Sequence, residues 1–186
     1  CNNPLCMPSR ASILTGRYPN THGVRTNGCI AHQELPLLPE QLKKAGYDTA
    51  AFGKMHFHPG SCENAGGYWP EHRELVDAGV DLTQPYLGFD TIRLGLGHSE
   101  ILPGLHERGM AETHPEILKL RGPRNALEAP DELIRDAHKI PTYKTAVPTE
   151  YYATNWVADQ TIAYLEQVDG PFFAWCDGYQ NSINGH

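Results

Sequence analysis

Residues 6–19, CMPSRASILTGRYP, constrain this chain most, because they predict a short helix that cannot be stable alone. Pro8 suits a first helical turn, and Gly16 is a natural left-handed helix end. Such a helix is only about 12 Å long, so it must pack into a larger fold. Cys6 then lies at the helix N-terminus, where the helix dipole favours an anion, and Arg10 follows about one turn later. A nucleophile-type side chain and an anion-binding arginine are therefore expected at one point.

Composition allows one ordinary domain and excludes several classes of protein. The chain has 186 residues and is 40% hydrophobic, enough for a real core. Its net charge of −7 and the lack of a basic run argue against a nucleic-acid partner. No apolar stretch has membrane-spanning length, so we expect no membrane segment. The five cysteines form no C-x-x-C pair and leave the redox compartment open. We assign no cellular location; a periplasmic or secreted one is compatible with these residues.

Helical and strand-like segments alternate along the chain, which predicts an α/β fold with a mostly parallel sheet flanked by helices. A glycine or proline bounds most of these segments. The predicted strands are 47–52, 89–94 and 172–176, of which the first and the last are predicted to be buried. The further predicted helices are 37–46, 110–120, 130–138 and 150–168.

A second group of polar residues, Lys54 and His56, directly follows the strand 47–52 and Gly53. Catalytic groups in open α/β sheets gather at the carboxyl ends of strands. On an extended segment, residues two apart project to the same side, so we expect both side chains to face one site. An isolated Lys-x-His pair is more often a surface lysine and a structural histidine, so the spacing alone leaves both readings open.

The first segment resembles the signature of the sulfatase family, a branch of the alkaline phosphatase superfamily. That signature is Cys-x-Pro-Ser-Arg followed by Leu-Thr-Gly-Arg, and here its fixed positions are Cys6, Pro8, Ser9, Arg10 and residues 14–17. Sulfatases also carry a Gly-Lys-x-His at the place of residues 53–56. The resemblance implies an alkaline-phosphatase-like sandwich of which residues 1–186 form the N-terminal portion of the catalytic domain. Within it, residues 59–148 correspond to the variable region on the substrate side, where we assign no site residue.

The resemblance also implies a chemistry for four residues. In the family, a formylglycine-generating enzyme oxidises the cysteine to formylglycine, whose hydrated aldehyde is the nucleophile and a ligand of a divalent cation, usually calcium. Carried over, Cys6 supplies the nucleophile and one metal ligand, and Arg10 and Lys54 neutralise the sulfate oxygens. His56 contacts the hydrate hydroxyl and acts as a base. Most other calcium ligands of the family would lie outside this chain.

The implied activity is hydrolysis of sulfate monoesters of saccharides or small molecules. A phosphonate or phosphate monoester hydrolase with the same aldehyde is an alternative, because both anions are tetrahedral. A catalytically incomplete fragment is another, and we expect these 186 residues alone to be inactive. Family members carry a Pro-His segment after the strand that corresponds to 172–176. Residues 177–186 lack it, so we assign no role to His186.

Overall fold

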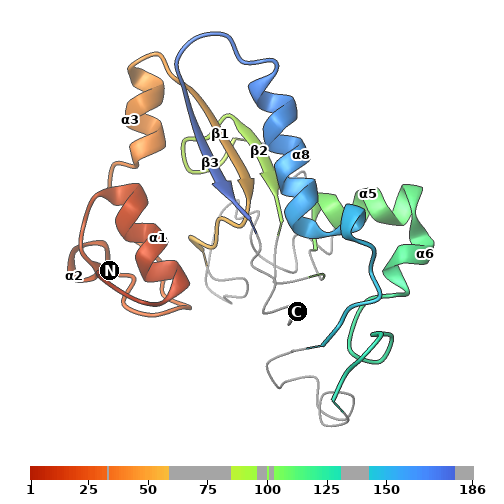
Figure 1. The fold of residues 1–186 in the computed structure, drawn as a ribbon. Coiled ribbons are helices and arrows are strands. Elements are labelled where there is room, and N and C mark those ends of the chain that lie inside the picture. Colours follow the sequence, from red (N-terminus) through yellow and green to blue (C-terminus); the bar gives the residue numbers. More distant parts are fainter. Residues whose placement is uncertain (33, 59–84, 96–99, 101–102, 131–142, 179–186) are drawn as a thin grey trace.

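The computed structural model describes residues 1–32, 34–58, 85–95, 100, 103–130 and 143–178 (Figure 1). Its helices are α1 Cys6–Thr15, α2 Pro19–His22, α3 Leu38–Lys44, α5 Leu105–Thr113, α6 Pro115–Leu118 and α8 Ala153–Leu165, with a 3-10 turn η1 Thr149–Tyr151. Its strands are β1 Asp48–Gly53, β2 Thr91–Leu94 and β3 Phe172–Asp177. The strands form one parallel sheet in the order β2-β1-β3, which confirms the predicted α/β class.

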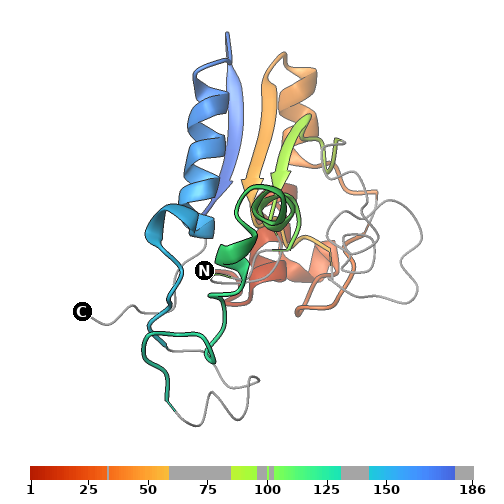
Figure 2. The same ribbon diagram turned by 90° about the vertical axis from the view of Figure 1, so that its right-hand side faces the viewer.

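Helices cover both faces of this sheet (Figures 1 and 2). Successive side chains of a strand point to opposite faces, and β1 uses both faces for burial. Ala50 and Phe52 pack against Ala153 and Val157 of α8. Ala51 belongs instead to the larger core on the other face, which includes buried residues of α1 and β2. The described part of the chain is therefore a three-layer α/β/α arrangement with β1 at its centre.

Parallel pairing brings the carboxyl ends of the three strands together. In the register of the sheet, Gly53 at the end of β1 lies opposite Leu94 of β2 and Asp177 of β3. Both views show α1 near the end of the sheet where the arrowheads of the strands lie (Figures 1 and 2). The signature helix and the segment after β1 thus meet at the edge where parallel sheets commonly carry their sites.

Some predictions of local structure need correction. Residues 172–176 were expected to be buried, but β3 is an edge strand of the described sheet, and Phe172 is 43% exposed. The predicted helix 110–120 is interrupted at Pro115, as expected for a proline at this position, but its first part, α5, already begins at Leu105. Nearly all of the predicted helix 130–138 lies outside the described residues. No helix in the described segments is both long and apolar enough to cross a membrane.

Candidate active site

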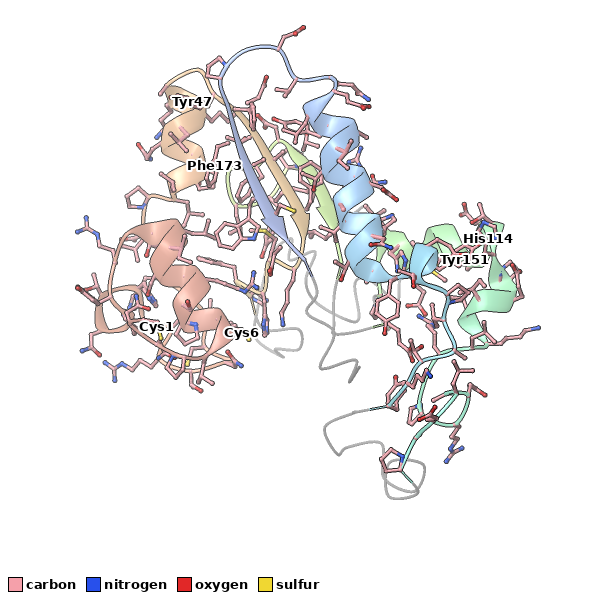
Figure 3. The ribbon with its side chains drawn as sticks, viewed as in Figure 1. Cys1, Cys6, Tyr47, His114, Tyr151 and Phe173 are labelled. Carbon is pink, nitrogen blue, oxygen red and sulfur yellow. The ribbon has the colours of Figure 1, made fainter. Side chains whose placement is uncertain are left out.

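Helix α1 begins at Cys6 and ends at Gly16, whose φ of 65° is left-handed, as the sequence predicts. The thiol of Cys6 is free, and the residue is half-buried at the helix end (Figure 3). Other N–H groups of this first turn are already accounted for. The N–H of Met7 donates to Oδ1 of Asn27 at 3.0 Å, and Pro8 has no N–H. An anion beside Cys6 must therefore be held mainly by side chains and by the helix dipole.

A buried histidine fastens α1 to the loop that follows it. Nδ1 of His22 accepts the N–H of Val24 at 3.1 Å, so the proton of a neutral ring lies on Nε2. Nε2 is 2.9 Å from Oγ of Ser12, and that hydroxyl donates to the carbonyl of Pro8, also at 2.9 Å. His22 is fully buried, and this burial lowers its pKa below 6.5. Its role is structural, and it depends on the neutral form of the ring.

We expect the free energy of unfolding to fall in acid because of this histidine. A group whose pKa is lowered by folding stabilises the fold above its unfolded pKa, near 6.5, and loses that contribution as pH falls through the folded value. The loss is at most about 1.4 kcal/mol per pH unit for one group. His106 on α5 adds a slope of the same sign, because burial lowers its pKa as well. Urea unfolding of the chain between pH 5 and 8 measures this slope.

Variants identify the source of the slope. Replacing His22 by glutamine should make unfolding less dependent on pH. Ser12→Ala removes a hydrogen bond but no titrating group, so it should lower stability about equally at every pH. A His22→Gln chain that keeps the full wild-type slope would contradict this assignment.

Arg10 connects three segments at the carboxyl edge of the sheet. Its Nη1 donates to the carbonyl of Lys54 at 2.6 Å and makes a longer contact of 3.4 Å to the carbonyl of Met55. Its Nη2 donates to the carboxylate of Asp177 in an ion pair. The guanidinium carbon also lies 5.8 Å from the ring centroid of Trp175. A guanidinium has five N–H groups, so these contacts do not use all of its donors.

The segment after β1 is not an extended continuation of the strand. Gly53 has φ 85° and His56 has φ 44°, both in the left-handed region. The two-residue alternation used to place Lys54 and His56 on one side therefore does not apply, because it requires an extended backbone. Both residues are half-buried. Convergence of their side chains with Cys6 and Arg10 on one anion stays a prediction.

Asp177 is the residue of this edge that the sequence analysis missed. It is the last residue of β3. From the sequence, residues 177–186 were distinguished only by their lack of the Pro-His segment. The available signal was its position directly after an apolar segment predicted to be a strand, because polar groups at the carboxyl ends of strands commonly belong to functional sites. The sequence analysis likewise assigned no role to Asn27, although its side chain caps α1.

The described residues do not by themselves fit a metal site. Within the described ranges, no group of three or more His, Cys, Asp or Glu side chains could hold a metal ion. A calcium ion takes six to eight oxygen ligands. The single ligand that the family resemblance assigns to this chain, Cys6, falls far short of that number.

The fold and the family agree when the chain is compared with known proteins. A solved phosphonate monoester hydrolase of Agrobacterium radiobacter superposes with a TM-score of 0.61 at 22% identity, over 96% of this chain and 32% of that protein. The chain thus shares the fold of the matching part of that hydrolase. The sulfatase family model matches residues 1–176, and the chain belongs to the sulfatase family.

Curated relatives match over shorter stretches. The N-acetylgalactosamine-6-sulfatase of Homo sapiens is 45% identical over an alignment of 76 residues, and the match covers 31% of this chain and 15% of that protein. The choline-sulfatase of Rhizobium meliloti is 41% identical over 56 residues, covering 30% of this chain and 11% of that protein. The endo-4-O-sulfatase of Bacteroides thetaiotaomicron is 39% identical over 87 residues, or 41% and 17% of the two chains. The matches to these relatives cover less than a fifth of each relative's length.

Proposed function

We propose that this chain is one part of an enzyme that hydrolyses sulfate monoesters through a formylglycine made from Cys6. The observation that carries the proposal is the family signature at the start of α1, joined through Arg10 to the segment of Lys54 and His56. A formylglycine-generating enzyme would be its partner during maturation. The substrate would be a saccharide or small-molecule sulfate ester, the two kinds that the names of the relatives mention.

The proposed role of each residue in the reaction follows from the chemistry of its side chain. The formylglycine would supply a hydrated aldehyde, a nucleophile toward sulfur that can afterwards release sulfate. Arg10 and Lys54 would bind sulfate oxygens and neutralise charge that grows during attack. Arg10 would use those of its N–H groups that do not already donate to Lys54, Met55 or Asp177. His56 would take the proton of the hydrate hydroxyl, because histidine is the side chain that most often serves as a general base in enzymes.

Calcium remains part of the proposal for the longer enzyme. Its ligands, apart from the residue at position 6, would come from segments outside those described here. Residues 59–148 would line part of the substrate pocket, as the variable region of the family does.

A phosphonate or phosphate monoester hydrolase is the second candidate. The fold is compatible with it, because the chain superposes on a phosphonate monoester hydrolase. Both reactions start from a tetrahedral anion, and the same lysine and arginine would neutralise either one. The relative rates at which the longer enzyme hydrolyses sulfate esters and phosphonate or phosphate esters would decide between the two candidate functions.

We expect no turnover of an aryl sulfate by the 186-residue chain alone. The superposition covers only 32% of the solved hydrolase, so most of that protein has no counterpart in this chain. An enzyme that joins this chain to the remaining segments of a sulfatase domain should cleave a chromogenic aryl sulfate, with calcium and not with chelator. Such an assay on both proteins is the direct comparison.

Two outcomes would change the proposal. Turnover by the chain alone that a chelator does not reduce would contradict the role given to the cation. Far faster cleavage of aryl phosphonates than of aryl sulfates by the longer enzyme would favour the second candidate.

A further inference from the structure

The guanidinium of Arg10 holds a strained turn of the backbone. His56 has φ 44°, a region that costs free energy for any residue with a Cβ and persists only when its surroundings impose it. The carbonyls of the two preceding residues, Lys54 and Met55, both accept from Nη1 of Arg10. These contacts fix the peptide planes that lead into His56. The conformation of the Lys54–His56 turn therefore depends on where Arg10 is held.

Asp177 is the group that orients this guanidinium. It lies on the neighbouring strand, in register with Gly53, so its backbone is fixed beside the point where the turn begins. Its carboxylate pairs with Nη2, while Nη1 faces the two carbonyls. The side chain of Arg10 is only 16% exposed, and that of Asp177 27%. Without the carboxylate, a partly buried guanidinium would lack its counter-charge and would turn toward water.

We propose that Asp177 is a positioning residue, which through Arg10 sets the turn that carries Lys54 and His56. Its carboxylate contacts Arg10, and we expect it to act on Lys54 and His56 through Arg10. Its effect on catalysis rests on the proposed function, whereas its effect on the conformation of the Lys54–His56 turn does not. The residue at the end of β3 thus links the third strand to the segment after the first.

Hydrogen exchange of the 186-residue chain tests the hold on the turn without any need for activity. In Asp177→Ala, amides of residues 54–58 should exchange at least about tenfold faster, while those of α8, residues 153–165, keep their wild-type rates. Asp177→Asn keeps an acceptor oxygen and loses only the charge, so its effect should be smaller. Asp90→Ala is the matched control, because Asp90 also forms an ion pair, with Lys43 at 2.5 Å, before the first residue of β2. It should leave residues 54–58 unchanged.

Kinetics of the longer enzyme test the catalytic part. A misplacement of about 1 Å can cost about a hundredfold in rate, so Asp177→Ala should lower kcat about ten- to a hundredfold with a smaller change in KM. Asp177→Asn should recover part of kcat, and Asp90→Ala should match the wild type.

The exchange measurement and the kinetic measurement can each contradict a different part of the proposal. Unchanged exchange at residues 54–58 in Asp177→Ala, or faster exchange throughout the chain, would overturn the positioning role. Faster exchange in this turn together with unchanged kcat in an active enzyme would overturn its importance for catalysis. An inactive wild-type enzyme with the expected exchange pattern would instead count against the proposed function and support the positioning role.

Discussion

Replacing Cys6 by alanine is expected to lower the kcat of the longer sulfatase at least about a thousandfold. Loss of the nucleophile in enzymes with covalent catalysis typically costs this much or more, because the remaining groups can only bind and polarise the ester. Alanine also suits a helix, so α1 should form without the thiol. The measurement is turnover of an aryl sulfate after co-expression with a formylglycine-generating enzyme.

Serine at position 6 should behave differently from alanine. A serine hydroxyl can accept the sulfate group, but it has no second hydroxyl on the same carbon through which sulfate can be expelled. We therefore expect Cys6→Ser to release at most one equivalent of phenol and then to stop, with sulfate still attached to the protein. Mass spectrometry of the peptide around position 6 detects both this adduct and the aldehyde of the wild type.

Cys29→Ala is the matched control, since Cys29 is also a half-buried free cysteine. It should keep activity and the aldehyde at position 6. Only unmodified cysteine at position 6 in the wild type, with an active maturation enzyme present, would contradict the proposal. Full activity of Cys6→Ala would contradict it as well.

Replacing Gly53 by alanine should destabilise the chain by about 2–5 kcal/mol. A Cβ on this residue would lie 2.2 Å from the carbonyl oxygen of Asp177 and 3.1 Å from Cγ2 of Val157. The carbonyl belongs to the strand paired with β1, so it can retreat only if β3 moves away. The left-handed φ of 85° adds about 1–2 kcal/mol for a residue with a side chain, and overpacking typically adds about 1–3 kcal/mol. Urea unfolding of the two chains measures the difference.

Gly46→Ala separates the steric clash from the backbone strain. Gly46 has nearly the same φ, 88°, but no atom lies within 4 Å of where its Cβ would be. This variant should lose only the conformational part, about 1–2 kcal/mol. Equal stability of the two variants would show that β1 and β3 are not as close as their register requires.

The sequence by itself determined the local structure near the signature and most of the sheet. Pro8 and Gly16 set the two ends of α1, because one lacks an N–H and the other accepts a left-handed φ. Alternation of helices with short apolar runs set the parallel α/β class. The family followed from the fixed positions of the signature, and the match of residues 1–176 confirms it.

Only the tertiary structure decided how the carboxyl edge of the sheet is assembled. Arg10 was expected to bind an anion, but the structure also joins it to two carbonyls and to Asp177, 167 residues away in the chain. The turn at His56 is left-handed where an extended strand was expected. The local sequence does not show that Arg10 pairs with Asp177, because this contact depends on the pairing of β3 with β1. Pairing of β3 beside β1 places a carboxylate at the end of a neighbouring strand, and the arginine between them then fixes the backbone that follows.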